Sequence, residues 1–142
     1  MANLTFFNRS LTNLQPSRIY RSVSSKLSVT DVLHINLTEF PFLIEIDFSR
    51  NGIELIEPGT FWQQRNLLKL SLSRNNLQEL YPNTFLGLIR LTYLSLSGLK
   101  LMSIDANVFD GLISLQTLDL SSNSITYITA GAFRGLNETE TL

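Results

Sequence analysis

The sequence predicts a repeat solenoid of the α/β type, with short parallel strands on a concave face and an irregular or short helical convex side. Hydrophobic residues recur with a constant period from position 43 onward, as the equivalent leucines Leu67, Leu91 and Leu115 show. Within each period, a segment such as Leu70-Ser71-Leu72 alternates with a period of two, as a short strand does. Leucine supplies 27 of the 142 residues, and cysteine is absent. These observations favour stacked coils and exclude a disulfide-stapled fold.

The repeat consists of eight columns of residues that persist over four periods. One period holds Leu67, Leu70, Leu72, Asn75, Leu77, Leu80, Phe85 and Leu88, and the other three are offset from it by the same constant step. Only Leu99, in the Asn column, and Gln64, in a Leu column, depart from type. Chance does not maintain a phase this well, so we predict four consecutive coils.

This pattern, L-x-x-L-x-L-x-x-N-x-L-x-x-L with a later Phe, resembles the leucine-rich repeat over residues 43–138. Its Phe column and 24-residue period resemble the extracellular animal subtype, as in Toll-like receptor ectodomains. The resemblance implies ligand-induced association, with a membrane span and a cytoplasmic signalling domain outside this piece. Extracellular members usually carry Cys-rich caps, and neither is present here. We therefore expect a fragment of a longer ectodomain.

The columns predict specific local structure. We expect strands at residues 45–49, 69–73, 93–97 and 117–121. Asn51, Asn75 and Asn123 should be buried and should bond backbone groups of the neighbouring turns. A stacked Phe column on the convex side should contain Phe61, Phe85, Phe109 and Phe133.

Two residues near these columns have alternative interpretations. Leu99 interrupts the Asn ladder, and we expect a slightly different turn there, helped by Gly98; a functional kink or contact is the alternative. Trp62 follows Phe61 on the back of the coil. We expect it to pack under the loop rather than reach solvent.

The predicted division of the chain follows the phase of the repeat. Residues 1–42 are expected to form degenerate repeats of undetermined register, in which Ser22 and Ser24 take the strand columns and Leu4 begins an out-of-phase repeat. An insertion or a shorter repeat would reconcile the two phases. Four full repeats follow, at residues 43–66, 67–90, 91–114 and 115–138. Residues 139–142 start a further, truncated repeat.

The composition argues against several function classes. The net charge of −1 argues against nucleic-acid binding, which requires a markedly basic surface. His34 is the single histidine, the sheet carboxylates lack a desolvated cleft, and neither a phosphate-binding loop nor a dinucleotide motif occurs. We therefore predict no enzyme, no cofactor and no metal site. No apolar run is long enough for a signal peptide or a membrane span.

The exposed positions of the strands hold the candidate binding residues. On the concave face these are Glu45, Asp47, Arg50, Lys69, Arg74, Tyr93, Thr117 and Asp119. Glu45 beside Lys69 is most simply a cross-strand ion pair, which stabilises little. The adjacent Arg50 and Arg74 form a candidate patch for an anionic ligand or an acidic protein surface. Tyr93 is a candidate aromatic anchor.

Four Asn-X-Ser/Thr sequons are N-glycosylation candidates, at Asn3, Asn8, Asn36 and Asn137. With the repeat subtype, they favour an extracellular or cell-surface location. The predicted function is a ligand- or protein-binding module of a cell-surface receptor of the pattern-recognition, innate-immune type. Its partners would be a protein, glycan or microbial ligand, and associated receptors. The alternatives are an adhesion or matrix scaffold without signalling, and an intracellular adaptor.

Overall fold

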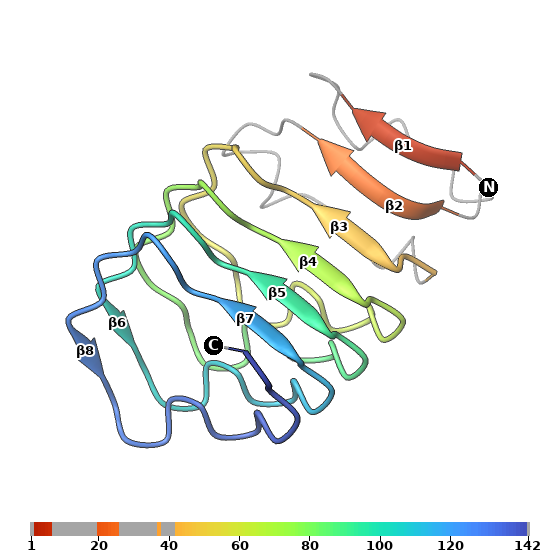
Figure 1. Ribbon diagram of the computed structural model, residues 1–142. Coiled ribbons are helices and arrows are strands. Elements are labelled where there is room, and N and C mark those ends of the chain that lie inside the picture. Colours follow the sequence, from red (N-terminus) through yellow and green to blue (C-terminus); the bar gives the residue numbers. More distant parts are fainter. Residues whose placement is uncertain (1, 7–19, 26–36, 38–41, 142) are drawn as a thin grey trace.

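The chain folds into a stack of coils in a computed structural model, which describes residues 2–6, 20–25, 37 and 42–141. Parallel strands form one six-stranded sheet in the order β1-β2-β3-β4-β5-β7 (Figure 1). The bounds are β1 Ala2–Phe6, β2 Tyr20–Ser25, β3 Glu45–Asp47, β4 Lys69–Ser71, β5 Tyr93–Ser95 and β7 Thr117–Asp119. A second, two-stranded parallel sheet pairs β6 (Ser103–Ile104) with β8 (Tyr127–Ile128).

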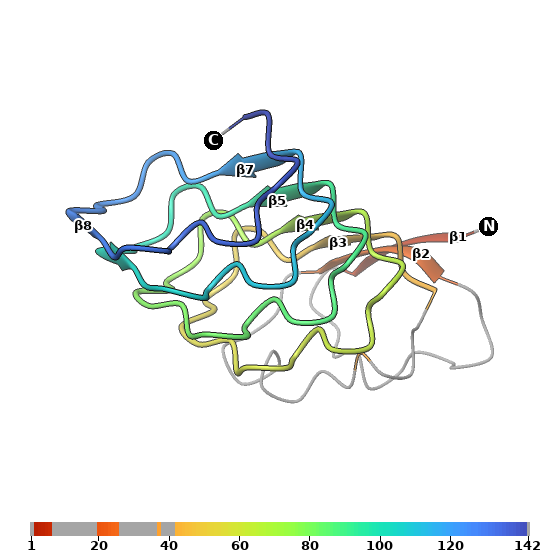
Figure 2. The ribbon, with the colours of Figure 1, turned by 90° about the horizontal axis from the view of Figure 1, so that it is seen from below.

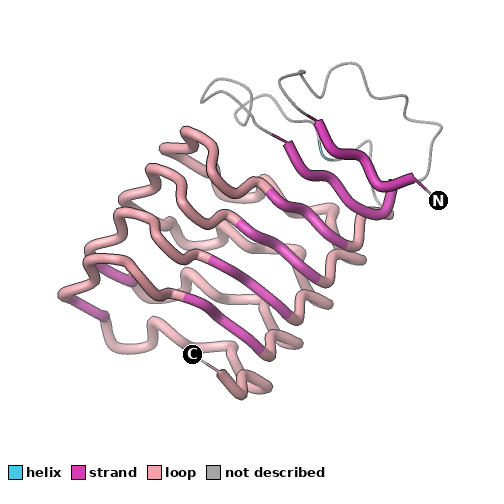
Figure 3. The backbone as a smooth tube through the Cα atoms, turned by 45° about the horizontal axis from the view of Figure 1, so that its top comes forward, coloured by secondary structure: helices cyan, strands magenta, loops and turns pink. Residues whose placement is uncertain are grey.

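The sheet lies on one side of the stack, and irregular segments form the other sides (Figures 2 and 3). Apart from the short β6–β8 pair, these segments are turns and loops, and the described residues contain no α-helix. The predicted solenoid with parallel strands is therefore confirmed, and its convex side is irregular rather than helical.

The register between β3, β4, β5 and β7 has the same constant step as the sequence repeat. The central residue of each strand pairs with the next and is at most 1% exposed, namely Ile46, Leu70, Leu94 and Leu118. No coil could bury this residue alone, because its neighbours above and below supply the covering atoms. Side chains one position away point to the opposite face of the sheet, toward solvent.

The strands are shorter than predicted, because each one ends two residues early. In two coils, the carboxylate that ends the strand also begins the turn. Asp47 Oδ1 accepts a hydrogen bond from the Ser49 amide at 2.9 Å, and Asp119 Oδ1 accepts one from the Ser121 amide at 3.0 Å. Such local side-chain bonds favour a turn over an extended strand. Coil-to-coil bonding nevertheless continues, since the Phe48 amide donates to the Ser71 carbonyl at 2.9 Å.

Asparagines connect successive turns, as predicted. Asn75 Nδ2 donates to the carbonyls of Phe48 and Leu72 at 2.9 and 2.7 Å. Its Oδ1 accepts from the amides of Asn51 and Ile53 at 3.0 and 3.2 Å. One side chain thus bonds four backbone groups of two coils, and the Phe48 carbonyl also accepts from Asn51 Nδ2 at 2.7 Å. Asn75 is buried, whereas Asn51 and Asn123 are only half-buried, contrary to the prediction.

The turn that contains Leu99 has the same geometry as its counterparts, so the expected local change in the turn is wrong. Gly98 has a φ of 64°, close to the φ of 58° at Arg50 and the φ of 56° at Arg74. The Lys100 amide still donates to the Leu77 carbonyl at 2.9 Å, one coil back. The leucine side chain has no polar atom, however, so the ladder lacks the hydrogen bonds of one asparagine although the backbone of this turn follows the same path.

The Phe column is stacked as predicted. Ring centroids of Phe61 and Phe85, Phe85 and Phe109, and Phe109 and Phe133 lie 6.4, 6.1 and 5.9 Å apart, with nearly parallel planes. Each such pair is worth about 0.5–1.5 kcal/mol beyond its buried area. The chain then turns back through glycines with positive φ, such as Gly87 at 99°. A Cβ on Gly87 would lie 2.3 Å from the Trp62 carbonyl oxygen, so the coils approach too closely there for any other residue.

The first two strands have a different spacing from the regular coils. Val23, not Ser22, pairs with Ile46, so this step is one residue shorter than the step from Ile46 to Leu70. The predicted strand columns at Ser22 and Ser24 are therefore wrong by one position. Leu4 pairs with Val23 after a still shorter step. In the next coil, Gln64 replaces leucine in its column, is buried and donates from Nε2 to the Leu37 carbonyl at 2.6 Å.

The last described residues begin to pair with β7 as a further strand would. Thr141 bridges Thr117 in parallel, and the Leu118 amide donates to the Thr141 carbonyl at 3.0 Å. Leu142, predicted to take the next strand position, lies outside the described residues.

Candidate functional site

The outward side chains of β3, β4, β5 and β7 form two rows, which we call the sheet face. Strand register places Glu45, Lys69, Tyr93 and Thr117 in one row, and Asp47, Ser71, Ser95 and Asp119 in the other. Neighbours in a row belong to strands about 4.8 Å apart. The structure therefore brings the predicted strand residues together on one surface.

Exposure differs along the sheet face. Glu45, Lys69 and Tyr93 are exposed, with Tyr93 at 37%. Thr117 is half-buried, and Ser95 is buried at 5%. The most accessible part of the face is thus the row from Glu45 to Tyr93. An aromatic ring beside charged groups can bury apolar area against a partner while its hydroxyl stays hydrogen-bonded.

The predicted ion pair between Glu45 and Lys69 does not form. The two residues are register partners on adjacent strands, yet no ion pair joins them within the described part of the chain. Exposed pairs gain little in high dielectric and lose side-chain entropy when held together. Both groups are therefore available to an external partner.

Arg50 and Arg74 lie at the edge of the sheet face, where the chain turns away from it. Both have positive φ, both are exposed, and neither makes an ion pair with a described residue. Arg74 extends toward the next coil, since its Cγ lies 3.3 Å from where a Cβ of Gly98 would be. Small Gly98 therefore leaves room for the arginine side chain.

Lys100 is an exposed cation that the sequence analysis missed. It comes two residues after the glycine turn of the next coil and forms no ion pair with a described residue. Its column holds Gly52, Asn76 and Ser124 in the other coils, so the repeat gives no reason to single it out. We call Arg50 and Arg74 the basic edge; Lys100, in the column of Asn76, follows the ladder position and lies outside it.

Trp62 is 50% exposed, so the expectation that it packs under the loop is wrong. The Arg65 guanidinium lies 5.8 Å from the centre of its ring. This cation–π contact covers part of the ring from the outside. The carbonyl of Trp62, in contrast, fits tightly against Gly87.

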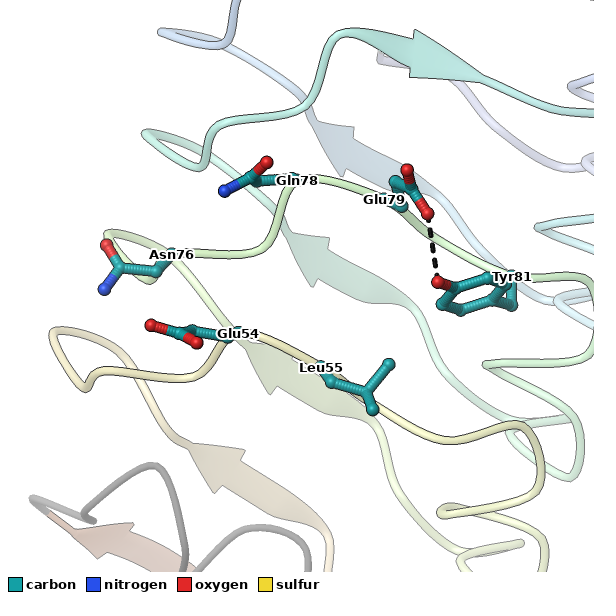
Figure 4. A pocket seen from close by; sticks show the side chains of 6 residues that line it. All are labelled: Glu54, Leu55, Asn76, Gln78, Glu79 and Tyr81. Carbon is teal, nitrogen blue, oxygen red and sulfur yellow. Dashed lines mark hydrogen bonds between the residues drawn. The ribbon is translucent and has the colours of Figure 1, made fainter.

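A hollow of about 250 Å³, which the sequence analysis also missed, spans two successive coils beyond the Asn ladder (Figure 4). It is lined by Glu54, Leu55, Asn76, Gln78, Glu79 and Tyr81. The Tyr81 hydroxyl donates to Glu79 Oε2 at 2.9 Å. This hydrogen bond, together with the negative charge of Glu79, raises the pKa of Tyr81 above its usual value.

The candidate glycosylation sites are only partly covered by the structure. Asn137 is exposed, and Thr139 of its sequon, which is half-buried, donates to the Leu115 carbonyl at 2.9 Å. Asn3 lies within β1, at the register position of Ser22. Asn8 and Asn36 lie outside the described residues, as does His34.

The described residues contain no group of three or more His, Cys, Asp or Glu side chains placed to hold a metal ion. Within the same residues, no helix is long and apolar enough to cross a membrane. The described surface offers hydrogen-bonding, ionic and aromatic groups, together with exposed aliphatic side chains such as Met102, Ile113 and Ile128.

Solved structures of two other proteins share the fold. The mouse RP105/MD-1 complex matches with a TM-score of 0.76 and 20% identity, over 99% of this chain and 25% of that one. The TLR13–ssRNA13 complex matches with a TM-score of 0.58 and 23% identity, over 89% of this chain and 21% of that one. This chain therefore spans a quarter or less of either protein. No curated protein matches it.

The TLR13 complex conflicts in part with the prediction that nucleic acid is excluded. TLR13 has this fold and is in a complex with ssRNA13. The net charge of a short stretch of coils does not describe the local charge at one edge of the stack.

A sequence profile described as "Leucine rich repeat" matches residues 41–101 and 89–142. Together these matches cover more than half of the chain. They coincide with the coils in which the Leu, Asn and Phe columns are regular. The chain therefore belongs to the leucine-rich repeat family.

Proposed function

We propose that this chain is a ligand-binding module of a cell-surface receptor of the innate-immune type, and that its ligand lies on the sheet face and the basic edge. The observation that carries the proposal is a row of exposed polar side chains that includes Tyr93, bordered by arginines without an ion pair to any described residue. The coil is held by its buried columns and Asn ladder, so these side chains have little part in stability.

The charges of this surface suit a ligand with anionic groups. Arg50 and Arg74 lie on successive coils and repel each other unless an anion lies between them. A guanidinium binds a carboxylate or phosphate through two parallel hydrogen bonds. A protein surface with acidic groups meets these requirements and also offers apolar area to Tyr93. The complex of RP105 with MD-1 supports a protein ligand.

The proposal is tested by screening the chain for binding to three kinds of ligand. These are a library of secreted proteins and receptor ectodomains, a glycan array and a single-stranded RNA. Each hit is then measured with Tyr93→Ala and with the double variant Arg50→Glu/Arg74→Glu. The matched control for charge in general is Arg90→Glu/Lys100→Glu, since both residues are exposed and lie outside the sheet face and the basic edge.

A central aromatic anchor carries about 2 kcal/mol or more, so Tyr93→Ala should weaken binding about 30-fold. The Arg50/Arg74 double variant should weaken it further at low salt than at high salt. The control should have a smaller effect than the Arg50/Arg74 variant. Equal affinity of the three variants and the wild type would contradict the proposed surface. A hit restricted to RNA would replace the protein ligand with a nucleic acid.

The proposed location is tested separately by secretion from a eukaryotic cell. Mass spectrometry should find glycan on Asn137, which lies between coils and is exposed. The variant Asn137→Gln should lose that glycan alone. Secreted chain without glycan at any sequon would count against an extracellular protein.

A further inference from the structure

The hollow beside the Asn ladder is not used by the proposed function, and its size limits what it can hold. Its volume is about 250 Å³, whereas pockets for drug-sized ligands span about 300–1,000 Å³ and are mostly apolar. Four of its six lining residues are polar: Glu54, Asn76, Gln78 and Glu79. A single polar side chain fits this volume and lining better than a free apolar molecule does.

The hollow offers many hydrogen-bond acceptors. Glu54 makes no hydrogen bond or ion pair with a described residue, and Glu79 accepts one bond from Tyr81. The amide oxygens of Asn76 and Gln78 add two more acceptors. No lysine or arginine lines the hollow to neutralise its two carboxylates. A cation with several N–H donors would satisfy the lining groups.

The remaining walls favour a flat cation on an aliphatic stem. The hydrogen bond to Glu79 fixes the Tyr81 ring, and Leu55, on the preceding coil, supplies an apolar wall (Figure 4). A guanidinium is planar, carries five donors and stacks on aromatic rings, whereas a lysine ammonium is compact and carries three. The methylene stem of an arginine can lie along apolar surface while its head remains hydrated.

We infer that this hollow binds an arginine side chain of a partner protein. Two surface carboxylates alone would be ordinary solvated charge. Here they border an open hollow that is also lined by the Tyr81 ring and the neighbouring Leu55 side chain (Figure 4). Negative charge and unused acceptors specify a cationic occupant, and the ring and wall specify arginine over lysine. This surface is separate from the sheet face and gives the coil a second contact.

The inference is tested by NMR on the full labelled chain, with N-acetyl-arginine amide as the probe. Side-chain amide signals of Asn76 and Gln78 and the methyl signals of Leu55 should shift and saturate. N-acetyl-citrulline amide, which has the same shape without the charge, should cause no saturable shift. N-acetyl-lysine amide should bind several-fold more weakly than the arginine probe.

Variants of the lining separate a specific site from general attraction to negative charge. Glu79→Gln and Glu54→Gln should each raise the dissociation constant about three- to fivefold, as expected for an exposed ion pair. Glu57→Gln is the matched control, because Glu57 is an exposed carboxylate on the same coil that does not line the hollow. It should leave the dissociation constant unchanged.

Three outcomes would overturn the inference. The first is an equal effect of Glu57→Gln and Glu79→Gln, and the second is equal binding of the citrulline and arginine probes. The third is a concentration-dependent shift of the hollow signals without any probe, which would assign the hollow to contact between copies of this chain. Saturable, charge-dependent binding of the arginine probe would support the inference.

Discussion

Replacing Asn75 by alanine should destabilise the coil more than any other single polar substitution in the described ladder. Asn75 is 3% exposed and makes four hydrogen bonds to backbone groups of two coils. Alanine would remove all four of these bonds, although the Phe48 carbonyl would keep its bond from Asn51 Nδ2. Water cannot replace a side chain at this depth without entering the apolar core.

The magnitude follows from the count of bonds. Each buried hydrogen bond contributes about 1 kcal/mol net, and an unsatisfied buried group is penalised by about 1–3 kcal/mol. Four bonds therefore place the loss of unfolding free energy for Asn75→Ala at about 3–5 kcal/mol. Asn123, also part of the ladder but half-buried, should lose about 1–2 kcal/mol in the same substitution, because water can reach part of its site.

The assay is equilibrium unfolding in urea, followed by circular dichroism and by the fluorescence of Trp62, the single tryptophan. The matched control is Asn76→Ala, since Asn76 is the adjacent asparagine and its side chain makes no hydrogen bond with a described residue. This change should shift stability by less than about 0.5 kcal/mol. If Asn75→Ala fails to fold, the comparison of Asn123→Ala with Asn76→Ala still tests the ladder. Equal losses for the buried and control positions would refute the reasoning.

Three further predictions concern the ladder, a turn and the hollow. Leu99→Asn should raise stability by about 1 kcal/mol in urea unfolding, because four new hydrogen bonds outweigh the lost leucine burial of about 1.5–3 kcal/mol. Gly87→Ala should lower stability by more than about 2 kcal/mol by the same measurement, since its φ is 99° and the new Cβ would meet the Trp62 carbonyl. Glu79→Gln should lower the pKa of Tyr81 toward its usual value in an absorbance titration of phenolate. Because the folded-state pKa is raised, this contact stabilises at lower pH and is lost as pH rises through that pKa.

Each of these changes has a control at a matched position. Leu99→Thr places a polar group in the ladder without an amide, so equal gains from threonine and asparagine would contradict ladder bonding. Gly59 also has positive φ, at 82°, but a Cβ there has nothing within 4 Å. Gly59→Ala should therefore lose less than Gly87→Ala. Glu57→Gln should leave the pKa of Tyr81 unchanged. If it lowers that pKa as much as Glu79→Gln does, general negative charge and not the hydrogen bond is the cause.

The period of the repeat was enough to predict the interior. Ile46, Leu70 and Leu94 are buried partners because each regular coil returns the chain to the same angular position after the same number of residues. Strand ends were not predictable from the period, since Asp47 ends its strand through a bond to its own turn. The register of the N-terminal strands was mispredicted for another reason. A coil one residue shorter moves Val23 into the position expected for Ser22, and a shift of one residue exchanges the two faces of a strand.

The two surfaces differ in how far sequence could predict them. The sheet face follows from alternation, because Glu45 and Asp47 must point away from Ile46. The hollow lies on irregular segments, where no period fixes the direction of a side chain. Glu54 and Tyr81 belong to successive coils and line one hollow because neighbouring coils are offset by one strand spacing. Trp62 was mispredicted for the same reason, as its direction depends on the turn before it.

Both surfaces are positioned by the ladder that separates them. Arg50 lies one residue before Asn51, and Glu54 lies three residues after it, so the turn at the asparagine directs the first to the sheet edge and the second to the hollow. A ladder variant would therefore disturb both contacts at once, and its loss of binding would say nothing about which groups touch a partner. Exposed substitutions such as Arg50→Glu and Glu54→Gln leave the ladder unchanged. If the two surfaces bind independently, each substitution should weaken binding only at the surface that carries it. If either substitution alone abolishes binding at both surfaces, a single partner spans the turn.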